Sequence, residues 1–103
     1  MAREYDKLVR DRIPEIIEAD GERPRVHVAD EDEYERRLRE KLDEEVREYR
    51  EDGGVEELAD VLEAVHALRE LAGVSAEELE AIRVEKAEER GRFEERIVLE
   101  RVE

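Results

Sequence analysis

Four acidic residues near the middle of the chain have the types and the spacing of a divalent-cation site. Glu45 and Glu48 lie three residues apart, and Glu57 and Asp60 repeat that spacing after a break at residues 52–54 (Asp-Gly-Gly). If the break turns one helix back along another, four carboxylates can converge on one ion. Carboxylate oxygens suit Mg²⁺ or Mn²⁺, and these ions mostly serve phosphate chemistry. The spacing therefore predicts a Mg²⁺ site, with Mn²⁺ as the alternative ion.

Spacing alone is weak evidence, because Asp and Glu make up 34 of the 103 residues. On the order of ten acidic pairs with this spacing arise by chance in such a composition. The direction of each side chain tells more. On a helix predicted over residues 31–51, Glu45 falls inside an apolar stripe, Glu48 lies at its edge and Glu44 lies farther round, toward solvent. The stripe consists of Tyr34, Leu38, Leu42, Val46 and Tyr49.

A second helix, predicted over residues 55–71, is apolar around more than half of its circumference, which is typical of a helix with neighbours on several sides. Glu57 points within this apolar arc, and Asp60 lies at its edge. A buried carboxylate must be protonated, paired with a cation or bound to a metal ion, since it is otherwise costly. Metal binding and ion pairing with Arg or Lys both remain open at this point.

A third helix is predicted after a turn at residues 73–75. Ser75 and Glu78 form a capping-box pattern at its start, and Gly91 is a plausible stop. Lys86 and Arg90 project on the same side as the apolar residues of this helix. They either run along apolar surface with their charged ends in water or hold phosphate groups beside the carboxylates.

Further cations stand near the carboxylates or near the start of the chain. Lys41 lies at the edge of the first long helix, and Lys7, Arg10 and Arg12 form a basic group in an otherwise acidic chain. Phosphate binding and ordinary salt bridging are both open for this basic group.

The ends of the chain are less regular. Residues 5–21 mix a basic start with a short helix, in which Pro14 suits the first turn. Residues 24–29 and 96–102 alternate well enough for two short strands. The fold class is therefore mainly α: one domain over residues 1–103, an antiparallel helical bundle with two short strand-like segments.

The bulk composition limits the class of partner. The net charge is −15 with a pI near 4.6, and this argues against nucleic acid or an anionic membrane as a partner. Sixteen Arg against three Lys, in so acidic a chain, indicate either a salt-rich cytoplasm or GC-rich coding. There is no Cys and no apolar run of signal-peptide or membrane-span length, so we expect a cytoplasmic protein.

The chain contains four characteristic sequence strings in this order: YDKLVRDRIPEII, KLDEEVREY, EELADVLEAV and KAEERGRFEERIVL. With them the chain resembles the MazG-type nucleotide pyrophosphohydrolases of the all-α NTP pyrophosphatase superfamily, in the phosphoribosyl-ATP pyrophosphohydrolase-like branch. The resemblance spans nearly the whole chain. It implies an all-α core, a homo-oligomer (dimer or tetramer) with active sites near subunit contacts, and cleavage of nucleoside triphosphates to monophosphate and pyrophosphate.

The resemblance also implies the metal ligands, and the mechanism that we expect at such an ion assigns roles to the other residues. The Mg²⁺ ligands would be Glu45, Glu48, Glu57 and Asp60. Glu48 is the expected acceptor of the proton from the attacking water, as catalytic base. The phosphate-binding residues would be Lys41, Lys86 and Arg90, with Lys7 and Arg10 as weaker candidates.

Two features depart from the family pattern. Only eight residues separate Glu48 from Glu57, which is fewer than the family usually has, and RGRF with Arg92 replaces the common RGGF.

Substrate and class remain open. The nucleotide is either a non-standard one removed in a house-cleaning role or the phosphoribosyl-ATP of histidine biosynthesis. The alternative of another class is a non-catalytic helical interaction protein, whose inward acids form salt bridges at an oligomer interface.

Overall fold

The computed structural model describes residues 3–103, and the regular structure within them is helical. Four helices follow one another: α1 (Ile13–Ala19), α2 (Glu31–Asp52), α3 (Val55–Leu71) and α4 (Ala76–Arg90). This confirms the predicted mainly-α fold class, and the three longer helices lie where the apolar periodicity placed them. No helix within residues 3–103 is long and apolar enough to cross a membrane.

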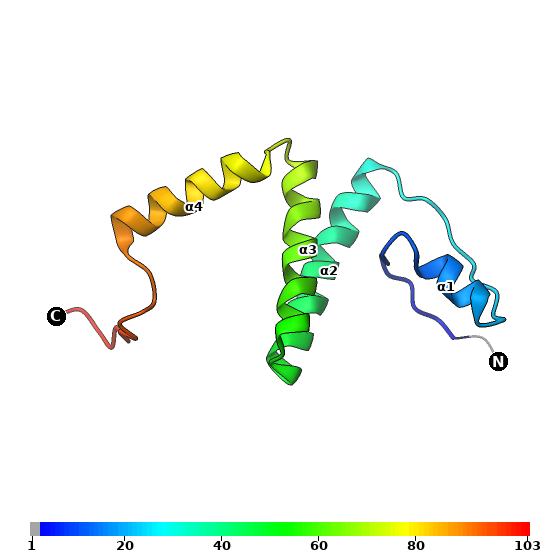
Figure 1. The fold of residues 1–103 in the computed structure, drawn as a ribbon, viewed down its shortest axis with the longest axis horizontal. Coiled ribbons are helices and arrows are strands. Elements are labelled where there is room, and N and C mark those ends of the chain that lie inside the picture. The colour runs from blue at the N-terminus through cyan, green and yellow to red at the C-terminus, as the bar shows by residue number, and fades with distance from the viewer. Residues whose placement is uncertain (1–2) are drawn as a thin grey trace.

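Helices α2 and α3 form an antiparallel hairpin, and this is the extensive helix–helix contact of the chain (Figure 1). The hairpin turns at Gly53, whose φ of 66° lies in the left-handed region and whose amide donates to the Tyr49 carbonyl over 2.7 Å. Gly54 then caps the start of α3. Leu38 of α2 and Ala64 of α3 are the buried apolar residues among residues 3–103. The core of a single chain is therefore small.

Helix α4 begins at the predicted capping box, where the Ser75 hydroxyl accepts from the Glu78 amide over 3.0 Å. It then leads away from the hairpin, and within residues 3–103 it has no close backbone contact with α2 (Figure 1). The molecule is consequently elongated, with extents of 59 × 31 × 25 Å.

The N-terminal segment is held to α2 by ion pairs rather than by helical packing. Arg37 of α2 donates to both the Asp6 carbonyl and the Asp6 carboxylate, each over 2.8 Å. These two bonds hold Asp6 at a φ of 44°, which is uncommon for a residue other than glycine. These bonds tie Asp6 to α2. Pro14 lies in the first turn of α1, as predicted.

The predicted strands at residues 24–29 and 96–102 are wrong, since both segments are irregular in the structure. The side chain of Val28 is 96% exposed, and Ile97, Val98 and Leu99 are exposed as well. A strand needs a neighbour whose backbone completes its hydrogen bonds. Neither segment has such a neighbour within the described residues, so alternation alone did not produce strand structure.

A single chain leaves an unusually large surface exposed. Its accessible area is 9695 Å², whereas a compact monomer of this mass exposes about 6,100 Å². Its radius of gyration is 18.1 Å, against about 13 Å for a compact domain of this length. The broad apolar arc of α3, which the sequence predicts to be covered on several sides, is covered mainly by α2.

Replacing Gly53 with alanine should destabilise the hairpin by about 1 kcal/mol, because a Cβ is unfavourable in the left-handed region. No atom lies within 4 Å of the position that this Cβ would take, so the loss reports backbone strain alone. Urea unfolding followed by circular dichroism measures it. Gly53→Asn is the matched control and should lose less, because Asn tolerates this conformation. Equal losses for both variants would contradict the strain explanation.

Candidate carboxylate site

Glu45 is the buried acid of the structure, and this confirms the prediction that it points inward. It shares the buried side of α2 with Leu38, and only 7% of the residue is exposed. Its Oε1 lies 3.0 Å from the Lys41 ammonium, one helical turn earlier. Its Oε2 is buried and has no hydrogen-bond partner within residues 3–103. A buried carboxylate oxygen without a partner is costly, so this atom is where a further cation would be most favourable.

Glu48 lies one turn further along α2 and is half-buried, which agrees with its predicted place at the edge of the apolar stripe. The negative charge of Glu45 raises the pKa of the Glu48 carboxyl, and burial and the charge of Glu44 add to the effect. These acids are therefore close enough to repel one another. Bringing in a cation, or protonating Glu48, would relieve that repulsion.

Glu44 departs from its predicted place toward solvent: it is half-buried under two lysines. The Oε1 of Glu44 accepts from the Lys7 ammonium over 2.6 Å, and its Oε2 lies 3.4 Å from the Lys41 ammonium. Burial disfavours the Glu44 carboxylate, but the bond from Lys7 and the charge of Lys41 outweigh it and lower its pKa. The pKa of Lys7 is raised in turn, chiefly by its hydrogen bond to Glu44. The N-terminal segment supplies this cover, and helical angles on α2 cannot reveal it.

The two acids of α3 are engaged separately. Asp60 Oδ1 accepts from the Arg10 guanidinium over 2.7 Å, and Arg10 comes from the same N-terminal segment as Lys7. The Glu57 carboxylate lies over Gly54, at the N-terminus of α3. An acid there is favourable because it faces the unpaired amides and the positive end of the helix.

The four predicted ligands do not converge on one point in the structure. Within residues 3–103 no three Asp, Glu or His residues lie close enough to share a metal ion. The fit to a cation is best at Glu45 and Glu48, which combine an unpartnered buried oxygen with mutual repulsion. Only two residues connect α2 to α3, so Glu57 in the first turn of α3 lies near the tip of the hairpin.

Of the predicted phosphate-binding residues, Lys7, Lys41 and Arg10 lie among the acids, whereas two others do not. Lys86 and Arg90 are exposed on α4, which leaves the hairpin. Within one chain the structure therefore does not bring them to the carboxylates.

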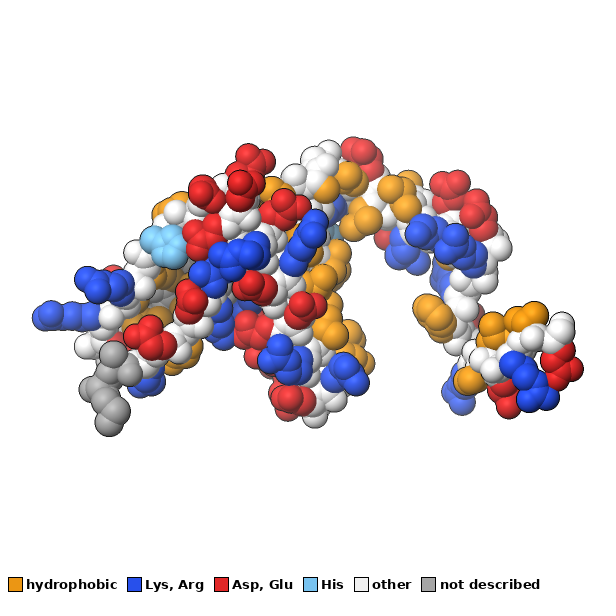
Figure 2. Space-filling view, turned by 180° about the vertical axis from the view of Figure 1, so that it is seen from behind, with side chains coloured by type: hydrophobic (Ala, Val, Ile, Leu, Met, Phe, Trp, Pro, Cys, Tyr) orange, Lys and Arg blue, Asp and Glu red, His pale blue; other side chains and the backbone are white. Residues whose placement is uncertain are grey.

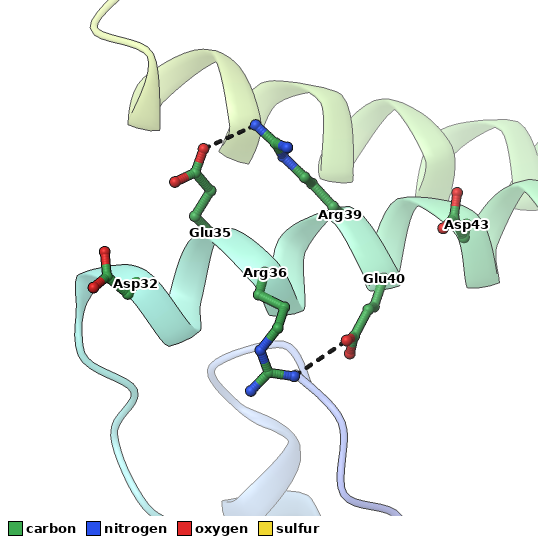
Figure 3. A pocket seen from close by; sticks show the side chains of 6 residues that line it. All are labelled: Asp32, Glu35, Arg36, Arg39, Glu40 and Asp43. Carbon is green, nitrogen blue, oxygen red and sulfur yellow. Dashed lines mark hydrogen bonds and ion pairs between the residues drawn. The ribbon is translucent and has the colours of Figure 1, made fainter.

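An open depression on the outer side of α2 has no part in this site (Figure 3). Arg39 pairs with Glu35 over 2.9 Å, and Arg36 pairs with Glu40 over 3.2 Å. Such exposed pairs along a helix stabilise it only slightly. Side chains of Asp32, Glu35, Arg36, Arg39, Glu40 and Asp43 line the depression. This is a solvated helix face.

Comparison with known proteins adds one relative. An uncharacterized protein from Mycolicibacterium smegmatis (strain ATCC 700084 / mc(2)155) is 54% identical over 44 residues. The match covers 43% of this chain and 45% of the relative, so less than half of either protein is compared. No protein-family model matches the chain, and no solved structure matches it significantly.

Replacing Glu45 with glutamine should lower the pKa of Glu48 toward the ordinary carboxyl value, because the largest cause of its elevation is removed. Carboxyl-carbon NMR titration measures this pKa. A raised folded-state pKa makes stability fall as the pH rises through it, and this fall should be smaller in Glu45→Gln. Asp43→Asn removes an exposed charge from the same helix and should leave Glu48 unchanged. An unshifted Glu48 in Glu45→Gln would contradict the repulsion.

Proposed function

We propose that the chain is a Mg²⁺-dependent nucleotide pyrophosphohydrolase, which releases a nucleoside monophosphate and pyrophosphate. The observation that carries the proposal is the buried Oε2 of Glu45, an acceptor without a partner on an acid-rich helix face. Beside it lies Glu48 with its raised pKa. Lys7 and Lys41, both close by, bring positive charge that a phosphate chain requires.

Glu45 and Glu48 would hold the ion, which is Mg²⁺ or Mn²⁺, and the resemblance adds Glu57 and Asp60 as ligands. Asp60 would exchange its pairing with Arg10 for the ion, and Arg10 would then be released toward a phosphate group. When bound, the ion supplies charge neutralisation at phosphate oxygens and a lowered pKa for a coordinated water.

The chain's own groups divide the remaining work. Glu48 is the proposed base, because it lies one helical turn from Glu45, beside the place where the ion and its coordinated water would be. Lys41, Lys7 and Arg10 would bind the phosphates and the pyrophosphate leaving group. Lys86 and Arg90 can take this role only from a neighbouring copy, since α4 leaves its own hairpin. The resemblance implies such a homo-oligomer, a dimer or a tetramer.

House-cleaning hydrolysis of non-standard nucleoside triphosphates is the proposed role, and phosphoribosyl-ATP hydrolysis is the alternative substrate with the same chemistry. Both belong in one assay panel. A cytoplasmic location is part of the proposal.

Pyrophosphate release from this panel should require Mg²⁺ and stop with EDTA. Glu48→Gln should lower kcat by about 10²–10⁴-fold, the usual contribution of a general base. The control is Asp43→Asn, an exposed acid on the solvated outer side of α2, which should leave kcat unchanged. A folded wild-type protein that releases no pyrophosphate from any member of the panel, at low or high KCl, would contradict the proposal.

The ion pairs also favour a second candidate, a non-catalytic helical oligomer. Glu44, Glu45 and Asp60 each have a cationic partner within the chain. Such pairs can serve structure alone, as at an oligomer interface.

Mg²⁺ separates the two candidates through thermal stability. A specific site should stabilise the folded protein by about 2.7 kcal/mol when Mg²⁺ is at one hundred times its Kd. Differential scanning calorimetry measures the resulting rise in Tm, at low salt and at molar KCl. The rise should vanish in Glu45→Gln and persist in Asp43→Asn. A Tm that Mg²⁺ leaves unchanged in the wild type would favour the structural candidate.

A further inference from the structure

Two apolar surfaces have nothing packed on them within residues 3–103. The first is the outer face of α3, formed by Val55, Leu58 and Leu62, in which Val55 is 82% exposed. The second is the C-terminal apolar segment, residues 93–102. Its exposed apolar side chains are Phe93, Ile97, Val98, Leu99 and Val102. Phe93 is 97% exposed, which is extreme for an aromatic side chain. Exposed apolar surface on this scale marks an interaction site.

Apolar side chains of the hairpin and of the C-terminal segment lie on opposite sides of one open space (Figure 2). Helix α4 leaves the end of α3 at a steep angle, and the C-terminal segment descends from its far end (Figure 1). Apolar side chains follow the edge of the hairpin and reappear on the C-terminal segment across the space (Figure 2). Because α4 holds them apart, the segment does not cover the α3 face of its own chain.

The amount of uncovered surface is that of an obligate oligomer. The chain exposes 9695 Å², which is about 3,600 Å² more than a compact monomer of its mass. Obligate homodimers bury about 2,000–5,000 Å² in total. Two copies together have more than enough excess surface to form such an interface.

We infer that a second copy of this chain fills the space, so that α4 and the C-terminal apolar segment of each copy cover the outer face of α3 of the other. A two-fold arrangement covers both surfaces of both chains in one interface, because each chain carries the two complementary parts. No other partner is needed to cover them.

The charges beside the apolar surfaces agree with this pairing. Lys86 and Arg90 lie on the same side of α4 as Ile82 and form no ion pair within residues 3–103. Glu56 and Glu63 flank the outer face of α3 and are likewise without an ion-pair partner among the described residues. Opposite charges at the rim would orient the two copies.

This inference goes beyond the oligomer implied by the resemblance, because it names the surfaces that meet and their exchange between chains. It does not depend on the chemistry at the carboxylates. The test therefore uses neither nucleotide nor divalent ion. Its failure would remove the contribution of Lys86 and Arg90 from a neighbouring copy, but it would leave the proposed chemistry at Glu45 and Glu48 untouched.

Phe93 is the one phenylalanine of the chain, so its ring signals are assigned without ambiguity. Labelled and unlabelled protein are mixed after unfolding and refolding, and isotope-filtered NOE spectra then report contacts between different copies. We expect such contacts between the Phe93 ring and the methyl groups of Val55, Leu58 or Leu62. Light scattering should give at least twice the chain mass of 12.2 kDa. A monomeric mass, or an oligomer in which these contacts are missing or arise within one chain, would overturn the inference.

A matched pair of variants tests the same surface by affinity. Leu62→Asn should raise the dissociation constant of the oligomer at least about tenfold, as truncation of a central apolar contact does. Val28→Asn alters an apolar residue that is even more exposed than Leu62 and lies far along the chain from both surfaces, and it should leave this constant within about twofold. Analytical ultracentrifugation measures both constants. Equal constants for the two variants would overturn the inference, and the contacts of Phe93 decide it if Leu62→Asn does not fold.

Discussion

The packing of α2 against α3 is the interaction on which the rest of the structure depends. It joins the two longest helices through a two-residue turn and buries Leu38 and Ala64. The same packing takes Glu45 out of water, and the Lys41 ammonium at 3.0 Å offsets part of the cost. The same contact between α2 and α3 therefore buries both the apolar core and the Glu45 carboxylate. Helices α1 and α4 lie at the two ends of the chain, outside this hairpin.

The N-terminal segment converts this acidic hairpin into a site of mixed charge. Asp6 anchors the segment to Arg37, and Lys7 and Arg10 then reach acids on two different helices. These ion pairs are partly exposed, so each one stabilises the fold only slightly. Their collective effect is to place cations among the acids of α2 and α3. Under the proposed function, these cations would leave the acids and bind a phosphate.

Local features of the sequence were sufficient to predict most of the helices and the inward direction of Glu45. Apolar periodicity placed the three longer helices, the Ser75–Glu78 pattern placed the start of α4, and helical angles placed Glu45 inward. The predictions that failed concern residues whose structure depends on neighbours distant in sequence. Glu44 is covered by Lys7, thirty-seven residues earlier. Residues 24–29 and 96–102 alternate like strands but have no strand beside them.

The direction of α4 could not be predicted for the same reason. Its apolar side predicts packing on the hairpin, and that packing is not made within one chain. If a second copy supplies the missing cover, as we infer, a pattern in one sequence cannot say which copy provides it. Ligand convergence fails on geometry, because the short turn holds Glu57 near the tip of the hairpin, over Gly54.

Paramagnetic line broadening by Mn²⁺ tests the carboxylate site most directly. In a chain with 34 acids, loose binding of divalent ions over the whole surface is the rival to a defined site. With Mn²⁺ at a small fraction of the protein concentration and at high KCl, the amide signals of Glu45 and Glu48 should broaden first. Glu45→Gln should abolish that selectivity. Broadening that spreads evenly over exposed acids, such as Asp32 and Asp43 on the outer side of α2, would contradict a defined site at Glu45.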